Sequence, residues 1–246
     1  MQTHTSPANI ASPSTSDLDR HDWPAMFASL DARGFAVLPK LLPPGPCEAT
    51  AALYDVDDIF RSRVVMARHG YGRGEYRYFS YPLPPLVAAL RASLYARLAP
   101  FANGWNERMK SEVRYPDKHE DFVARCHAGG QLRPTPLLLR YGPDDYNCLH
   151  QDLYGEHVFP LQAVALLSAP GADFSGGELV LTEQRPRMQS RAEVVPLRQG
   201  DATIFAVNQR PVEGSRGAYR VNTRHGVSRV ISGQRHTLGV IFHDAK

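Results

Sequence analysis

The sequence predicts a mainly β protein, a sandwich or jelly roll preceded by α-helices. From Thr135 onward, short apolar runs that resemble strands alternate with turns rich in glycine, proline and aspartate, a pattern typical of such folds. Before that point, apolar residues recur at helical spacing. With 246 residues, 43% of them hydrophobic, the chain is long enough to bury one substantial core as a single domain.

The domain boundaries follow from composition. Residues 1–20 are rich in Ser, Thr, Pro and Ala and are expected to form a disordered tail. Residues 21–246 are then one domain, in which residues 21–134 supply helical support and a lid and residues 135–246 form the jelly-roll core.

The N-terminal part is expected to begin with a short helix capped by Asp22 and ended by Gly34, followed by a strand over residues 34–39. Two helical stripes follow and are interpreted as core faces: Ala49, Ala52, Leu53, Val56 and Phe60, then Leu86, Leu90, Leu94 and Leu98. Between them, residues 71–81 form a glycine- and aromatic-rich stretch, interpreted either as a lid or substrate-binding segment or as an ordinary loop.

The predicted strands of the core lie in the second half of the chain. They cover residues 137–141, the segment that leads to His150, and residues 163–167, 178–181, 194–197, 202–207, 221–231 and 236–243.

Composition excludes several classes of protein. The net charge is only +3, and no block of five or six like charges marks a nucleic-acid-binding arm. No apolar run approaches the length of a transmembrane helix, and the N-terminus lacks the apolar core of a signal peptide. Three scattered cysteines favour reduced thiols, so a cytoplasmic protein is expected.

The segment around His150 carries the strongest chemical signal. In a strand, alternate side chains share a face, so His150 and Asp152 are expected to point toward the same place. A second imidazole would complete a 2-His-1-carboxylate triad, which leaves coordination positions open on iron(II). A second His-x-Asp, at His119, lies within a run of charged residues and is interpreted as a solvated loop or helix end.

Four residues are candidates for the second imidazole: His157, His225, His236 and His243. His157 follows a glycine break and is expected in a loop, whereas His225 lies in a late predicted strand. If that strand and the last one form a hairpin with a three-residue loop ending at Gly233, then His225, Arg235 and Thr237 share a face. Arg235 would lie about 13 Å along the strand from His225, a gap that a five-carbon dicarboxylate could span.

These residues together resemble the iron(II)/2-oxoglutarate-dependent oxygenases, and prolyl-4-hydroxylase-like members in particular. The resemblance covers residues 135–244, and the chain as a whole is similar to a bacterial subgroup of that superfamily. The matching features are His150-x-Asp152, His225, Arg235-x-Thr237 and the stretches at residues 140–143, 176–178 and 197–205.

The resemblance implies a double-stranded β-helix with iron at one mouth. It implies that His150, Asp152 and His225 hold Fe(II) and form the catalytic centre. Arg235, assisted by Thr237 and Tyr141, would bind the cosubstrate 2-oxoglutarate. Molecular oxygen would then convert 2-oxoglutarate to succinate and carbon dioxide while an unactivated C–H bond of the substrate is oxidised.

Two other functions remain open from sequence. One is a jelly-roll binding protein without redox chemistry, which would leave an inward-facing Arg235 unexplained because an unpaired buried guanidinium is costly. The other is a cupin-type metalloenzyme that does not use 2-oxoglutarate, although such sites usually place further histidines near the first.

The substrate is the least defined part of the prediction. Residues 176–178 favour hydroxylation of a protein or peptide residue, while Arg185, Arg187, Arg191 and Arg198 suggest an acidic or phosphate-bearing substrate such as alkylated nucleic acid. A solvated arginine-rich edge is the favoured explanation of those charges. Hydroxylation versus demethylation and the oligomeric state stay open.

Overall fold

The computed structural model describes residues 18–215 and 217–246. Of the predicted tail, residues 1–17 lie outside this range, but its last three residues are described. Leu18 is buried in the core, and its carbonyl accepts a hydrogen bond of 2.9 Å from the indole of Trp23. The prediction that the tail extends to residue 20 is therefore wrong at its end, since Leu18 packs with the domain.

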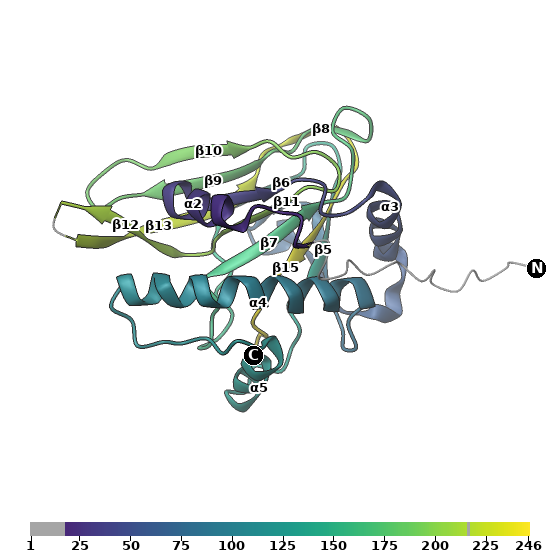
Figure 1. Ribbon diagram of the computed structural model, residues 1–246. Helices are drawn as coiled ribbons and strands as arrows, with labels where there is room; N and C mark the ends of the chain where they lie inside the picture. Colours follow the sequence, from purple (N-terminus) through teal and green to yellow (C-terminus); the bar gives the residue numbers. More distant parts are fainter. Residues whose placement is uncertain (1–17, 216) are drawn as a thin grey trace, which may run out of the picture.

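Two antiparallel sheets form the body of the molecule (Figure 1). The larger has seven strands in the order β1-β11-β7-β15-β5-β4-β2, and the other has six, with the path β10-β9-β13-β6-β3 and β12 paired to β13. Strands distant in sequence are neighbours, and β8 and β14 form a separate pair. The prediction of a mainly β jelly roll with supporting helices is confirmed.

The bounds of the elements are as follows. The helices are α2 (Trp23–Arg33), α3 (Pro44–Ala52), α4 (Pro85–Arg108) and α5 (His119–Ala128), with 3-10 turns η1 (Leu53–Asp55), η2 (Asp57–Ile59) and η3 (Met66–Arg68). The strands are β1 (Phe35–Leu38), β2 (Phe60–Val65), β3 (Gly72–Arg73), β4 (Glu75–Phe79), β5 (Leu137–Tyr141), β6 (Tyr146–His150), β7 (Leu161–Leu166), β8 (Phe174–Gly176), β9 (Leu179–Gln184), β10 (Arg191–Val195), β11 (Ala202–Ala206), β12 (Gln209–Gly214), β13 (Gly217–Val227), β14 (Val230–Gly233) and β15 (Arg235–Val240).

The first predicted helix and strand are confirmed. The Asp22 carboxylate accepts a hydrogen bond from the Ala25 amide at 3.0 Å, which satisfies one of the free donors at the start of α2. Gly34 ends the helix in the left-handed region with φ +81°, where a glycine avoids the steric cost of a side chain. The chain then enters β1, which pairs with β11 at the edge of the seven-stranded sheet.

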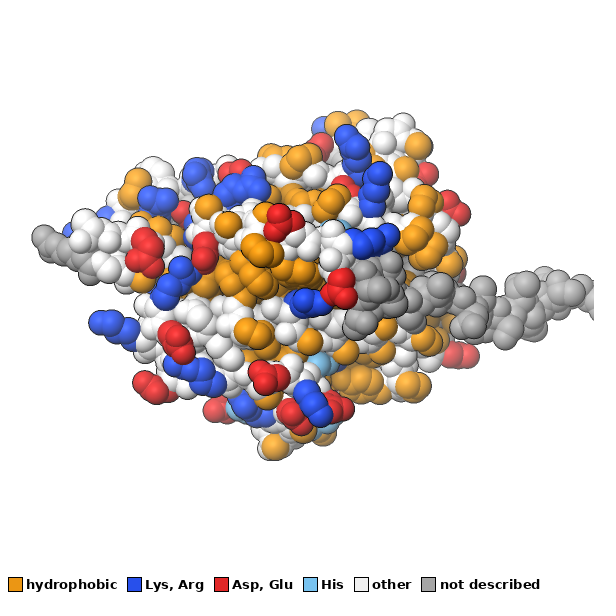
Figure 2. All heavy atoms as spheres, in the orientation of Figure 1, with side chains coloured by type: hydrophobic (Ala, Val, Ile, Leu, Met, Phe, Trp, Pro, Cys, Tyr) orange, Lys and Arg blue, Asp and Glu red, His pale blue; other side chains and the backbone are white. Residues whose placement is uncertain are grey.

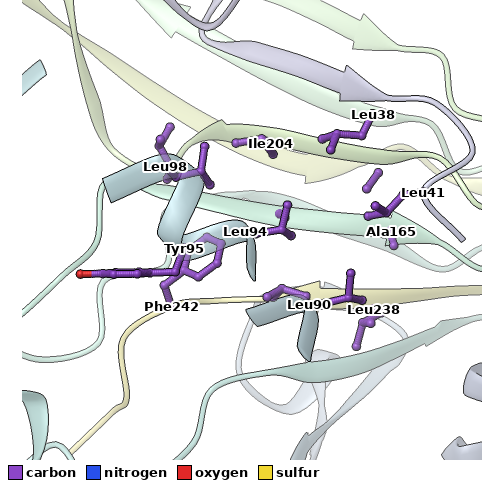
Figure 3. Close-up of a cluster of buried hydrophobic side chains, with 14 of the residues drawn as sticks. Leu38, Leu41, Leu90, Leu94, Tyr95, Leu98, Ala165, Ile204, Leu238 and Phe242 are labelled. Atoms are coloured by element: carbon purple, nitrogen blue, oxygen red, sulfur yellow. The ribbon is translucent and has the colours of Figure 1, made fainter. Parts of the chain in front are cut away.

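Helix α4 covers one face of the seven-stranded sheet. Its predicted leucine stripe is buried, because these side chains pack against strands of that sheet (Figure 3). Leu90, Leu94 and Leu98 are at most 1% exposed and belong to the same cluster as Ile204 of β11 and Leu238 of β15. Burial of each such leucine contributes about 1.5–3 kcal/mol.

No helix in the described part of the chain is both long and apolar enough to cross a membrane.

The other predicted helical stripe is wrong beyond residue 52. Helix α3 ends at Ala52, two 3-10 turns follow, and Phe60 opens strand β2. Val56 is 44% exposed, so it belongs to no core face, while the ring of Phe60 stacks on that of Phe79 at 4.8 Å. The apolar spacing was helical by coincidence, because tertiary packing of Phe60 on the neighbouring strand overrides it.

Most of residues 71–81 belong to strands β3 and β4 of the two sheets rather than to a free loop. Strand β3 pairs with β6 in the six-stranded sheet, and β4 pairs with β5 in the seven-stranded sheet. The segment therefore joins the two sheets along one side of the sandwich. It also shows that the N-terminal part is not only helical, since β1 to β4 all belong to it.

The predicted C-terminal hairpin is wrong. Strand β13, which carries His225, pairs with β6, β9 and β12, whereas β15, which begins at Arg235, pairs with β5 and β7. Between them, β14 pairs with β8 instead of returning along β13. Residues 225 and 235 thus lie in opposite sheets, and the expected separation of about 13 Å along one hairpin does not apply. The hairpin formed by β12 and β13 was not predicted.

A buried ion pair ties the C-terminus to helix α4. Arg91 and Asp244 are at most 1% exposed and lie 2.7 Å apart, and Asp244 also accepts hydrogen bonds from Tyr81 and His127. Replacing Arg91 with methionine is expected to lower the free energy of unfolding by about 3–5 kcal/mol, because a buried carboxylate loses its counterion. Urea denaturation of both proteins measures the difference in the free energy of unfolding.

The matched control for that substitution is Arg97→Met on the same helix. Arg97 forms an exposed ion pair with Asp19, and its side chain is 43% exposed. Loss of an exposed pair costs less than about 1 kcal/mol. Equal destabilisation by Arg91→Met and Arg97→Met would show that the buried pair has no special role.

Candidate active site

A cavity of about 340 Å³ lies between the two sheets. Its lining comes from strands of both sheets and includes all six residues predicted to form the site: Tyr141, His150, Asp152, His225, Arg235 and Thr237. The structure thus brings the predicted residues into one cavity, although through a different strand pairing from the one expected.

His150, Asp152 and His225 form one cluster. His150 ends β6 directly opposite His225 of β13, and their ring centroids are 4.1 Å apart. The carboxylate of Asp152 lies 3.6 Å from Nε2 of His150 and 3.3 Å from Nε2 of His225. One ligand atom from each residue lies within 4.8 Å of the other two, and no other such group of three occurs among residues 18–215 and 217–246.

Hydrogen bonding and charge prepare His150 and Asp152 to donate electron pairs. Nδ1 of His150 lies 2.8 Å from the Cys148 carbonyl, so Nδ1–H donates to it and Nε2 stays free. Burial lowers the pKa of His150, and the charge of His225 lowers it further, which favours the neutral ring. Burial alone would raise the pKa of Asp152, but the hydrogen bond and charge of His225 outweigh it, so the pKa lies below its usual value.

Two tyrosines that the sequence analysis did not single out support Asp152. The hydroxyl of Tyr154 donates to Asp152 Oδ1 at 2.7 Å, and the hydroxyl of Tyr78 lies 3.0 Å from that of Tyr154. Tyr154 continues the alternation of His150 and Asp152 along the chain, a signal that could have identified it. The pair orients one carboxylate oxygen and leaves the other toward His225.

Replacing Tyr154 with phenylalanine is expected to weaken metal binding at this cluster about tenfold or more. Groups that orient metal-binding carboxylates typically contribute 10- to 100-fold to affinity. Titration with Fe(II) under anaerobic conditions, or with Mn(II), measures the change. Tyr78→Phe is the matched control and should have a smaller effect, since its hydroxyl reaches Asp152 only through Tyr154. Equal affinities in wild type and Tyr154→Phe would contradict this role.

Arg235 presents an unpaired cation to the same cavity. Its side chain is 2% exposed, and its Nε and Nη1 atoms have no hydrogen-bond partner among the described residues. Burial lowers the pKa of Arg235, and no carboxylate forms an ion pair with it in the described part of the chain. A buried guanidinium without a partner is costly, which indicates that an anion completes the site.

A glycine makes room for this arginine. Gly177 has φ +66°, and a Cβ atom there would lie 2.9 Å from Cδ of Arg235 and 2.8 Å from a methyl of Val230. Within the stretch at residues 176–178, the second glycine is therefore required, because a side chain at Gly177 would displace the guanidinium of Arg235.

Tyr141 and Thr237 flank Arg235. Tyr141 is its partner across strands β5 and β15, with the guanidinium carbon 5.5 Å from the ring centroid. Burial raises the pKa of Tyr141 to about 12, so its hydroxyl is a proton donor at neutral pH. Thr237 is two residues after Arg235 on the same strand, is 2% exposed and lines the cavity as well. These groups together offer a carboxylate several donors.

Gln162 is a further polar residue that the sequence analysis did not identify. It lies on β7, is 5% exposed, and its Nε2 atom is 3.1 Å from Nε2 of His225. Its Oε1 atom is buried without a partner. A glutamine within an otherwise apolar strand was the available signal, because buried polar side chains are normally paired.

The remaining histidine candidates lie away from the cluster. The amide of His157 donates to Gln131, the ring of His236 faces Tyr54, and His243 is buried where its Nδ1 accepts from the Phe159 amide. His119 lies at a helix end, as one of the two interpretations had it, but it is half-buried rather than fully solvated: burial lowers its pKa to about 4, and Nε2 lies 2.8 Å from the Phe242 carbonyl.

Solved structures show what class of fold this is. The chain is similar to a prolyl hydroxylase of Trichoplax adhaerens in complex with a hypoxia inducible factor peptide fragment (TM-score 0.56, 13% identity, 92% of this chain and 91% of that one). It is also similar to a Pseudomonas putida prolyl-4-hydroxylase (TM-score 0.52, 14% identity, 88% and 96%) and to a 2OG-Fe(II) oxygenase family oxidoreductase from Burkholderia pseudomallei (TM-score 0.52, 15% identity, 92% and 93%). The fold is that of the 2-oxoglutarate- and Fe(II)-dependent oxygenases.

Sequence comparison identifies the family. Residues 74–245 match the model of the family Oxygenase-NA, described as "Oxygenase, catalysing oxidative methylation of damaged DNA". Two uncharacterized proteins from two strains of Mycobacterium tuberculosis are each 48% identical over 167 residues, covering 68% of this chain and 72% of theirs. The chain belongs to the Oxygenase-NA family. It is therefore an enzyme, an oxygenase, as predicted, and the alternative of a jelly-roll binding protein without redox chemistry is set aside.

Proposed function

We propose that the chain is an Fe(II)- and 2-oxoglutarate-dependent oxygenase that removes a methyl group from an alkylated nucleic-acid base. The observation that carries the cosubstrate assignment is the unpaired guanidinium of Arg235 in the same cavity as the His150–Asp152–His225 cluster. A cupin-type enzyme that does not use 2-oxoglutarate would leave this cation without an anion.

The donor set fits the metal. Two imidazoles and one carboxylate are the facial triad that binds Fe(II) and leaves positions open. His150, Asp152 and His225 would hold the ion, while Arg235, Tyr141 and Thr237 would bind the far carboxylate of 2-oxoglutarate. When bound, the metal and its cosubstrate supply oxidation of a C–H bond by molecular oxygen, with succinate and carbon dioxide as products.

The protein's own residues then orient the metal ligands and shield the cavity from water. Tyr154 holds the Asp152 carboxylate, and the Cys148 carbonyl holds the His150 ring. If His225 binds the metal through Nε2, that atom can no longer accept a hydrogen bond from Gln162. The Gln162 amide would then be available to a ligand in the cavity. Apolar side chains such as Val164 and Leu179 line the walls and exclude water.

The substrate class rests on the family and on the aromatic lining of the cavity. The family description names damaged DNA. Besides the predicted site residues, the cavity is lined by Tyr76, Tyr78 and Tyr154 with Leu137 and Ile241. Aromatic rings with hydroxyl groups suit a planar base that has been taken out of its stack. Oxidation of an N-methyl carbon gives an N-hydroxymethyl group, which releases formaldehyde and restores the N–H.

The test is turnover on paired substrates. The full-length protein is supplied with Fe(II), 2-oxoglutarate and a single-stranded oligonucleotide carrying one N-methylated base. We expect formaldehyde and succinate in equal amounts, with little of either from the unmethylated strand. A proline-containing peptide serves as the other arm, because hydroxylation of a protein residue was the prediction from residues 176–178. Turnover of the peptide alone would overturn the nucleic-acid assignment and keep the oxygenase.

A further inference from the structure

The segment between β2 and β4 forms part of the rim of the cavity. We call residues 68–73 the rim segment. Arg68, His69, Tyr71 and Arg73 are all exposed on it, and Tyr71 is 50% exposed although it also lines the cavity. A tyrosine ring that borders both a cavity and solvent is placed to contact whatever enters.

Two aromatic rings of the rim segment already stack. The ring centroids of His69 and Tyr71 are 5.3 Å apart and their planes differ by 22°. The outer ring thus rests on a second planar group, which restricts its motion. Exposed stacked rings of this kind are the platforms on which bases of single-stranded nucleic acid stack, without regard to base identity.

The rim segment is held in place by the strand that carries His150. The Cys148 amide donates to the Tyr71 carbonyl at 2.9 Å, and Gly72 pairs with Asn147 of β6. Gly72 has φ +126°, and a Cβ atom there would lie only 2.4 Å from the Tyr146 carbonyl oxygen, so the close approach needs glycine. The platform is therefore a fixed extension of the sheet that supplies His150, rather than a lid.

The rim segment begins and ends with a cation, Arg68 and Arg73. Arg68 forms no ion pair with any described residue, and the guanidinium of Arg73 lies 3.9 Å from Asp145, at the limit of such a contact. Arg68 is thus available to contact a phosphate, and the long contact of Arg73 with Asp145 leaves most of its guanidinium available as well. Figure 2 shows one face of the molecule, on which acidic and basic side chains are interspersed without one continuous basic band.

From these observations we infer that the rim segment binds single-stranded nucleic acid. Tyr71, backed by His69, stacks on the base next to the one in the cavity, and Arg68 and Arg73 contact the flanking phosphates. This inference rests on the proposed nucleic-acid substrate and adds the site that would hold the strand. Arg185, Arg187, Arg191 and Arg198 lie on or beside strands β9 and β10, at the opposite edge of the six-stranded sheet from β3, and are not part of it.

The test is binding of a fluorescein-labelled single-stranded oligonucleotide with one N-methylated base, measured by anisotropy over a range of salt concentrations. Tyr71→Ala should weaken binding about tenfold, within the range for loss of one base–aromatic stack, and Tyr71→Phe should restore it. Arg68→Ala and Arg73→Ala should each reduce the slope of log K against log salt by about 0.7. Arg187→Ala is the matched control and should change neither quantity.

A second variant gives a positive signal and does not depend on loss of function. Trp23 and Trp105, the two tryptophans of the chain, are buried, so Tyr71→Trp places one exposed indole on the rim. Its fluorescence should be quenched when the oligonucleotide binds. Wild-type protein that binds no oligonucleotide would overturn the nucleic-acid substrate and the platform together. Wild-type binding that is unchanged in Tyr71→Ala and Arg68→Ala would overturn the platform alone.

Discussion

Replacing His225 with alanine is expected to abolish Fe(II) binding and turnover while the fold survives. His225 supplies one of the two imidazoles of the cluster, with its Nε2 atom 3.3 Å from the carboxylate of Asp152. Two of three donors would remain, too few for a site that normally takes its ligands from three side chains. The same result is expected for His150→Ala, since the two rings face each other across paired strands. Anaerobic titration with Fe(II) measures the loss, and circular dichroism checks the fold.

The control for these variants is the other His-x-Asp motif. His119→Ala should keep full Fe(II) affinity, because His119 lies at the start of α5 and outside the cavity. Its imidazole packs beside Tyr95 and bonds the Phe242 carbonyl, so the variant is expected to lose some stability but no metal affinity. Normal Fe(II) affinity in His225→Ala would remove His225 from the ligand set.

Local patterns predicted the elements whose cause is local. Asp22 and Gly34 mark the ends of α2, and the leucine stripe of α4 is buried, because caps and helical periodicity are determined within a few residues. The prediction that His150 and Asp152 point toward the same place also rests on a local pattern, the alternation of side chains along the chain. The stripe ending at Phe60 failed because apolar residues at that spacing also suit a strand, and a partner distant in sequence, Phe79, decides between the two.

The relation between His225 and Arg235 could not be predicted from spacing. Arg235 follows His225 by ten residues with a predicted turn between them, which favoured a hairpin, but the chain crosses from the six-stranded to the seven-stranded sheet over that interval. Both side chains still line one cavity, because the two sheets face each other across it. Gln162 was missed for a related reason: it reaches His225 from β7 of the opposite sheet, 63 residues away in sequence.

Replacing Arg235 with lysine is expected to raise the apparent constant for 2-oxoglutarate about tenfold or more, equivalent to roughly 1.5–3 kcal/mol for a charge-assisted hydrogen bond. An ammonium is a point charge that lacks the planar fork of a guanidinium, so it cannot bind a carboxylate through two parallel bonds. Fe(II) affinity should be unchanged, and Tyr141→Phe should shift the 2-oxoglutarate constant less in the same direction. Arg229→Lys is the control, because Arg229 is exposed and paired with Asp144.

Arg235→Met separates a ligand-binding role from a structural one. If Arg235 merely supported the fold, its loss would destabilise the protein under all conditions. Because its Nε and Nη1 atoms are buried without partners, an apolar side chain of similar length should instead leave the ligand-free protein as stable or more stable. Wild-type protein should gain thermal stability as 2-oxoglutarate is added with Mn(II), and the variant should gain none, since only a bound ligand shifts the equilibrium. A ligand-free Arg235→Met protein that melts well below wild type, together with an unaltered 2-oxoglutarate titration for Arg235→Lys, would place the cosubstrate carboxylate elsewhere in the cavity.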